Sequence, residues 1–354
     1  MCWSLAAWTA SAQPRDLASR AAAARHANDL PAALELYRQA VQEKPGWLEG
    51  WWFLGLLSYK LDQFADGRQA FTEFTKLNAN APSSWAFLGL CEYETGDYDD
   101  ALQHLERGLA PGARLDPQVE QVARFHRALL LTRAGSFDRA RDELQPFVER
   151  GIHDPILIAG VGLNALELPV LPREVPAAQR DLVETAGQTA CTWIKGDSRQ
   201  TEAAFRSLLN AYPNAPGVHY LYASYLLTSR PEAVNAELQR ELEVNPGNAR
   251  VRAVMALRLR VAGDPAAALP FARKAAADAP GLGLAQYAYG VVLTETGALS
   301  DAIVHLQAAV RIDPANLEYH TTLATAYSEA GHFEDAYRER QASIKLARES
   351  RGPG

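Results

Sequence analysis

The sequence predicts an all-α fold, an α-solenoid of about nine helix-turn-helix units. Two observations predict this fold class. Residues of one type recur every 34 positions, and this spacing separates Pro246, Pro280 and Pro314. Within each period, apolar residues recur at spacings of three and four, which places them on one stripe of a helix. Each unit must bury those stripes against its neighbours.

Composition narrows the class of protein. The chain has 354 residues, of which 35 are Lys or Arg and 42 are Asp or Glu, so its net charge is −7. This charge gives no basic field for a polyphosphate backbone, so we expect no nucleic-acid partner. No run of about 18 apolar residues occurs, so we predict no transmembrane segment in the body of the chain. The three cysteines form no CxxC pair, which disfavours a disulfide framework or a zinc site.

The first predicted element is an apolar N-terminal stretch, residues 1–12. It ends in Ala10-Ser11-Ala12, the small-x-small pattern that signal peptidase favours. No basic region precedes it, which a start codon assigned too far downstream would explain. We therefore expect a truncated signal-peptide remnant and a periplasmic or secreted protein. The alternatives are a frayed first helix and a cytoplasmic protein.

The second predicted element is an N-terminal block of repeats over residues 14–154. Its clearest units contain Trp51 and Trp85, which are one period apart. The interval lengthens to 39 residues between the turn glycines Gly96 and Gly135. The extra residues form a loop rich in Pro and Gly, so the repeats continue on both sides of it.

The third predicted element, residues 155–176, is an extra helix followed by a Pro-rich connection between two blocks. We expect the helix over residues 156–166, after which three prolines prevent a helix from continuing. The connection is either a hinge or a loop packed onto the solenoid. Gly160 and Gly162 resemble part of a phosphate loop, but no strand precedes them. We expect these glycines to allow close helix contact instead.

The fourth predicted element is a C-terminal block of repeats, residues 177–349. Gly263, Gly297 and Gly331 keep the 34-residue period and interrupt the apolar stripes, so they mark the turn inside each unit. The last predicted helix, residues 334–348, is rich in charge. It is expected to act as a solvating cap on the array.

The 34-residue unit resembles the tetratricopeptide repeat. That family has a large residue followed by Leu-Gly or Leu-Ala, a Gly at the turn, Ala and an aromatic residue or Leu in the second helix, and a closing Pro. The third unit matches with Trp85, Leu88, Gly89, Gly96, Tyr98, Ala101 and Leu105. The resemblance implies a right-handed superhelix whose first helices line a concave groove, where family members commonly hold extended peptides.

The resemblance also implies candidate peptide-binding positions, the fifth, ninth and twelfth of each unit when Trp51 is counted as the fourth. This groove is aromatic and aliphatic, and it lacks the Lys and Asn donors of the family subtype that grips a terminal carboxylate. The alternative is that these side chains fill contacts between adjacent repeats. The candidate groove residues are Trp52, Leu56, Tyr59, Leu90, Tyr93, Phe125, Leu129, Tyr220, Ser224, Leu257, Tyr287 and Val291.

The sequence carries no motif of a catalytic or metal site. Its eight histidines include no helical i, i+4 pair and no HExxH, and neither a GxSxG elbow nor a GxxxxGK[ST] loop occurs. We therefore predict no catalytic residues, no metal site and no cofactor. The predicted function is a non-catalytic scaffold that binds a protein or peptide partner, in a bacterial cell envelope. Two alternatives stay open: an enzyme whose site is assembled across repeats, and a self-associating assembly protein.

Overall fold

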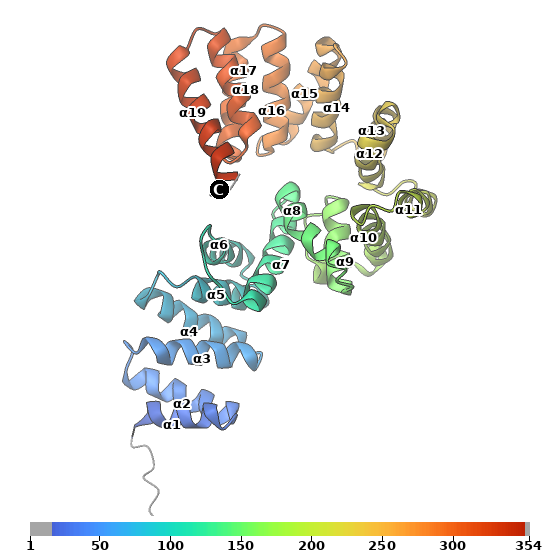
Figure 1. Ribbon diagram of the computed structural model, residues 1–354. Helices are drawn as coiled ribbons and strands as arrows, with labels where there is room; N and C mark the ends of the chain where they lie inside the picture. The colour runs from blue at the N-terminus through green and yellow to red at the C-terminus, as the bar shows by residue number, and fades with distance from the viewer. Residues whose placement is uncertain (1–15, 351–354) are drawn as a thin grey trace, which may run out of the picture. The chain divides into compact units, whose positions relative to one another are not determined.

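The computed structural model describes residues 16–350, and over that range it contains 19 α-helices, three short 3-10 helices and no strand (Figure 1). The all-α fold class is thus confirmed. No helix in the described range is long and apolar enough to cross a membrane. The predicted signal-peptide remnant, residues 1–12, lies outside the described residues. Contacts divide the chain into two compact units, one ending at Lys195 and the other beginning at Gly196.

The first unit consists of five consecutive helix pairs, and we call the first helix of each pair A and the second B. Tyr37, Phe71 and Leu105 follow one another at the 34-residue period and are fully buried in successive B helices. The repeated apolar stripe therefore forms the core of the pairs, as the sequence predicted. The pairs are α1 (Leu17–His26) with α2 (Leu30–Glu43), α3 (Leu48–Lys60) with α4 (Phe64–Leu77), α5 (Pro82–Thr95) with α6 (Tyr98–Gly108), α7 (Pro117–Arg133) with α8 (Phe137–Glu149), and α9 (Pro155–Ala165) with α10 (Arg180–Ile194).

The second unit begins with α11 (Ser198–Ala211) and continues with four helix pairs. Ala268, Ala302 and Ala336 recur at the period and are buried in three successive B helices. Together the two units contain nine pairs, in agreement with the predicted number. The pairs are α12 (Val218–Ser229) with α13 (Val234–Val244), α14 (Ala249–Val261) with α15 (Pro265–Asp278), α16 (Gly283–Glu295) with α17 (Leu299–Ile312), and α18 (Leu317–Glu329) with α19 (Phe333–Ser350).

The turn between the A and B helices requires a left-handed backbone at one position. Asn28, Asp62 and Gly96 lie one period apart and have φ angles of 59°, 56° and 89°. Glycine adopts this conformation without strain, and Asn and Asp tolerate it better than other residues do. These three residues therefore repeat the same turn with different side chains.

The glycines of α9 allow a close crossing with α10. A Cβ atom on Gly162 would lie 2.0 Å from the carbonyl oxygen of Val183, and one on Gly187 would lie 2.1 Å from that of Ile158. Real Cβ atoms do not approach backbone that closely, so only glycine fits at either position. The segment is helical and follows no strand, so the phosphate-loop resemblance has no structural basis.

The Pro-rich connection packs onto the first unit. We call residues 168–176 the strap; its 3-10 helix, η1 (Pro172–Glu174), follows Leu171. Leu171 has no exposed surface and lies in one apolar cluster with Tyr93 and Leu129. The strap is thus a packed loop, and the compact units divide after α10, downstream of the connection that the sequence predicted.

The last helix, α19, differs from the solvating cap that its charge predicted. It is the B helix of the final pair and packs on α18. Phe333 and Tyr337 on this helix are nevertheless 72% and 63% exposed. A high proportion of charged residues on one helix does not prevent another of its faces from being apolar, so composition alone misjudged this element.

Candidate functional site

Three candidate groove residues lie on α3, and all three are half-buried. The ring of Trp52 packs against Phe74 and Phe87, with centroid distances of 5.4 and 5.9 Å. The ring of Tyr59 lies 5.3 Å from Phe87 on α5, and Leu56 packs in the same cluster. These side chains therefore join two successive helix pairs, and only part of each remains available to a ligand.

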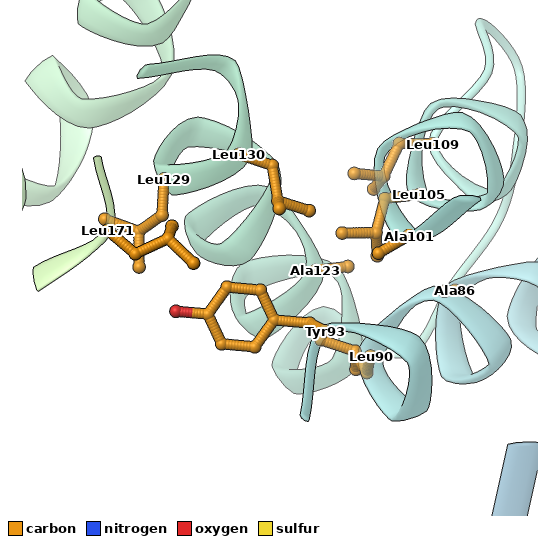
Figure 2. Close-up of a cluster of buried hydrophobic side chains, with 10 residues drawn as sticks. All are labelled: Ala86, Leu90, Tyr93, Ala101, Leu105, Leu109, Ala123, Leu129, Leu130 and Leu171. Carbon is orange, nitrogen blue, oxygen red and sulfur yellow. The ribbon is translucent and has the colours of Figure 1, made fainter. Parts of the chain in front are cut away.

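Three further candidates lie beneath the strap. Figure 2 shows the side chain of Tyr93, on α5, pointing toward Leu129 of α7 and Leu171 of the strap. Leu90, Tyr93 and Leu129 are all buried. Burial raises the pKa of Tyr93 to about 12, because the phenolate would lose its hydration. The strap thus covers the stretch of groove that these residues were predicted to form.

Polar contacts hold the strap in the same place. The guanidinium of Arg173 donates a hydrogen bond to the backbone carbonyl of Tyr93 and lies 3.4 Å from the carboxylate of Glu94. It also stacks over the rings of Tyr93 and Tyr98, 4.5 and 5.3 Å from their centroids. Cation–π contacts of this kind add to the apolar burial of the strap.

The five candidates in the second unit lie on three successive A helices. Tyr220 and Ser224 on α12 and Leu257 on α14 are half-buried, whereas Tyr287 and Val291 on α16 are buried. The structure places them at equivalent positions of successive pairs, as the sequence predicted. Their side chains pack in the apolar clusters between adjacent helices, with the hydroxyl of Ser224 bonded to the carbonyl of Tyr220.

Tyr287 illustrates what the buried candidates do. Its ring stacks on Tyr319 of α18 at a centroid distance of 4.9 Å, and its hydroxyl donates to Glu318, 2.7 Å away. Burial raises the pKa of Tyr287 to about 12. At the buried positions the side chains fill contacts between repeats, which is the alternative that the sequence left open. Peptide binding by the half-buried candidates stays a prediction.

A recess of about 170 Å³ opens beside the remaining candidate, Phe125 of α7. Apolar side chains dominate its lining, and one carboxylate, that of Asp154, stands at its edge. The recess is lined by Gln121, Val122, Phe125, His126, Phe147, Ile152, Asp154 and Leu157. All of these belong to the first unit, so the recess is formed within it by α7, α8 and α9.

A second recess of about 240 Å³ lies on the other side of α9, between that helix, the strap and α10. Arg180 and Glu184 place one charge of each sign on its wall, and the rest of the lining is apolar. It is lined by Pro155, Ile158, Ala159, Pro172, Val175, Arg180, Val183 and Glu184. The strap therefore covers part of the predicted groove and also forms one wall of this second recess.

An exposed apolar ridge separates the two recesses. On α9, Leu157 faces the first recess and Ile158 faces the second, which leaves Ile156 between them at 52% exposure. Val122 on α7 is also exposed, at 38%. We call the two recesses and this ridge the α9 surface. Its central apolar residues are Val122, Phe125, Ile152, Pro155, Ile156 and Ile158.

His126 forms the polar edge of the α9 surface. Its Nδ1 donates to the backbone carbonyl of Val122 at 2.8 Å, and its ring packs edge-on against Tyr93 at a centroid distance of 4.6 Å. Burial lowers the pKa of His126, because the low-dielectric surroundings disfavour the imidazolium. Burial therefore favours the neutral imidazole of His126 over the imidazolium.

The sequence identified Phe125 but missed the ridge around it. Val122 and Ile156 are not at the positions that the repeat pattern assigns to the groove. One signal was available: the α9 segment Pro155-Ile-Leu-Ile-Ala159 contains more consecutive apolar residues than a single buried stripe requires. Which of them stays exposed depends on α7, α10 and the strap, so sequence periodicity alone could not reveal it.

The described residues include no group of three or more His, Cys, Asp or Glu side chains that could hold a metal ion. A polar hollow of about 340 Å³ lies at the start of α6 and is lined by Gly96, Asp97, Tyr98, Asp99, Asp100 and Arg133. Carboxylates at a helix start interact favourably with the helix dipole.

The repeat family is identified by a family model. Residues 54–120 and 253–316 match the model of the tetratricopeptide repeat. These two regions of the chain are therefore tetratricopeptide repeats, as the 34-residue period predicted. Such repeats are protein-interaction modules, so a protein-interaction scaffold is the general function that the family supports. No curated protein sequence matches the chain.

Several solved structures show distant similarity. MamA from Desulfovibrio magneticus RS-1, residue 41 to its end, is 18% identical over 48% of this chain and 96% of that chain, with a TM-score of 0.41. The APC/C hetero-tetramer Cut9–Hcn1 gives 15% identity over 93% of this chain and 72% of that chain, with a TM-score of 0.33. Yeast Tom70 is 13% identical over 94% of this chain and 91% of that chain, with a TM-score of 0.37. These similarities are too distant to carry a function to this chain.

Proposed function

We propose that the first unit binds an apolar peptide segment of a partner protein on the α9 surface. One observation carries this proposal: two recesses with mainly apolar linings flank a ridge residue, Ile156, that is half exposed. Recesses on each side of a ridge accept two apolar anchors of one ligand, and such anchors supply most of the free energy of binding in protein interfaces. The protein acts in this proposal as a non-catalytic scaffold.

The charges around the α9 surface further restrict which peptide sequences it could bind. Asp154 stands at the edge of the first recess, and Arg180 and Glu184 stand on the wall of the second. A ligand with two apolar side chains and a basic residue beside the first would match these charges.

The test is selection of peptides from a random display library on the full chain, followed by calorimetric titration of the selected peptides. Ile156→Glu and Val122→Glu are expected to weaken binding by about tenfold or more, because each places a charge where apolar surface is buried. The control is Val304→Glu, an exposed valine of α17 in the second unit. If all three variants bind the peptides as tightly as the wild type does, the α9 surface is not the binding site.

The candidate groove positions outside the α9 surface need a separate test. Trp52 and Tyr220 are half-buried, so a peptide could contact their exposed parts. A Trp52→Ala, Tyr220→Ala double variant should lose partner binding and keep its helical circular dichroism if the groove is used. Unchanged binding would confine recognition to other surfaces.

We propose a bacterial cell-envelope location on sequence grounds alone. Its support is the apolar stretch of residues 1–12 with its small-x-small end. A fusion of the first twenty or so residues to a reporter enzyme that is active only outside the cytoplasm tests it. Reporter activity that Ala12→Leu abolishes supports export. An inactive reporter fusion would favour the cytoplasmic alternative.

A further inference from the structure

The final helix, α19, exposes an apolar face. Phe333, Tyr337 and Ile344 are 72%, 63% and 43% exposed. Their spacings of four and seven residues place them on one side of the helix. Three large apolar side chains on one helix face exceed the single exposed apolar residues that protein surfaces commonly carry. Arg340 lies on the same face, between Tyr337 and Ile344, and its guanidinium donates a hydrogen bond to the hydroxyl of Ser328 on α18.

Equivalent positions inside the array are covered by the next helix pair. Ile303 and Val310 on α17 precede Tyr337 and Ile344 by one 34-residue period, and they are half-buried against the cluster that contains Tyr319 of α18. The face of α19 therefore has the pattern of an inter-pair contact surface. The exposure of Tyr337 and Ile344 shows that no described part of the chain covers it.

We propose that this face binds the same face of a second copy of the chain, with the two α19 helices antiparallel about a two-fold axis. The charges of α19 favour this occupant. Glu334 lies in its first turn, whereas Arg348 lies in its last turn. Asp335, also in the first turn, is paired with Arg338 of its own helix. Antiparallel pairing sets the acidic turn of each copy beside the basic end of the other, so the helix is complementary to itself.

One register pairs the apolar residues and also brings Phe333 to a cation. It places Arg340 near the two-fold axis, where the hydrogen bond to Ser328 of its own chain holds the guanidinium. When Tyr337 packs against Ile344 of the second copy, Phe333 lies beside Arg348 of the second copy, because four residues back on one helix correspond to four residues forward on the other. The ring of Phe333 can then accept the guanidinium in a cation–π contact, with Glu334 next to it. The two-fold axis makes each of these contacts twice.

The expected dimer is weak. A helix of 18 residues is about 27 Å long. One helix from each copy buries less than the roughly 1,600 Å² of a standard interface, so we expect a dissociation constant of roughly 1–100 μM.

The test is the mass of the full chain in solution, measured by light scattering or sedimentation from roughly 1 to 300 μM. We expect it to rise from 38.7 kDa toward twice that value. Tyr337→Glu should stay at the monomer mass at every concentration, because it would bury a charge twice in the interface. Val304→Glu, with the same new side chain on α17, should dimerise as the wild type does. Circular dichroism confirms that each variant is folded.

A charge exchange tests the antiparallel register. Glu334→Arg and Arg348→Glu should each weaken the dimer by several-fold, and the chain that carries both should recover it, since the attraction across the axis is restored with reversed sign. A monomer mass throughout, or a dimer that Tyr337→Glu does not weaken, would overturn the proposal. Failure of the combined variant to recover would overturn the antiparallel arrangement.

Discussion

His219 and His320 each join the two helices of a pair in the second unit. The Nδ1 of His219 lies 2.7 Å from the carboxylate of Glu237, and its Nε2 lies 2.9 Å from the carbonyl of Pro213. His320 makes the same contact with Glu339, at 2.6 Å. His219 and His320 occupy the repeat position that Trp51 and Trp85 occupy in the first unit.

We expect His219→Ala to destabilise the second unit by about 2–3 kcal/mol, because it removes a charge-assisted hydrogen bond from a carboxylate that is 6% exposed. Urea unfolding measures the change. His332→Ala is the control, since that ring is largely exposed on the same unit and should cost little. If both variants lose the same free energy of unfolding, the buried pair of His219 and Glu237 does not stabilise the unit more than the exposed ring of His332 does.

Glu241 is a distant cap for α12. Its side chain has no exposed surface and accepts hydrogen bonds from the backbone N–H groups of Gly217, at 2.8 Å, and Tyr220, at 3.3 Å. Burial nevertheless raises the pKa of Glu241 above its usual 4.5, against the opposing effect of these donors. Folding therefore favours the protonated carboxyl.

This pKa shift predicts a pH dependence. A raised folded-state pKa means that the stabilisation is fully present below pH 4.5 and is lost as the pH rises through the raised value. The free energy of unfolding of the wild type, relative to Glu241→Gln, should therefore fall between pH 4.5 and neutral pH. Urea titrations of both proteins at several pH values measure it. If the difference in free energy of unfolding between the two proteins stays constant or rises over this pH range, the pKa of Glu241 is not raised by folding.

At the scale of elements, the α9–α10 crossing is the closest contact described. Gly187→Ala should destabilise the first unit by about 2–3 kcal/mol, because its Cβ would meet the backbone of α9, which cannot move aside as a flexible side chain can. Thermal unfolding measures the loss. Gly46→Ala is the matched control, since nothing lies within 4 Å of its added Cβ and its φ is not positive. If the two variants unfold at the same temperature, α9 and α10 can move apart with little loss of stability.

The elements themselves were largely predictable. The period of 34 fixed the positions of turns such as those at Asn28, Asp62 and Gly96, because local backbone needs recur with the repeat. The strap position was not predictable. Arg173 contacts Tyr93 across 80 residues of sequence, and no local pattern encodes a contact between a loop and helices that far away.

The site was predictable only in part for a related reason. A repeat pattern indicates which face a residue lies on, but the exposure of that face depends on its neighbours. Phe125 was identified and lines a recess, whereas Leu90 and Leu129, assigned by the same rule, lie beneath the strap. Ile156 was missed because it lies outside the pattern altogether.

At the scale of the whole molecule, the division at Lys195 and Gly196 predicts two separately unfolding units. Leu171→Ala should destabilise the first unit by about 2–5 kcal/mol, because it empties a fully buried site. Amide hydrogen exchange should then quicken in α5 to α10 and stay unchanged in α12 to α19. His219→Ala should give the reverse pattern. Faster exchange throughout the chain in either variant would mean that the units unfold together.

The strap also limits how this chain can change its length. Tandem arrays gain and lose whole repeats by duplication and deletion, and most intervals of a solenoid tolerate such events because each pair contacts only its neighbours. The contact of Arg173 with Tyr93 spans α6, one complete pair, α7 with α8, and α9. Inserting or deleting a pair there would carry the strap away from its partners. Related chains should therefore vary in repeat number before α5 or after α10, and keep a single pair between α6 and α9.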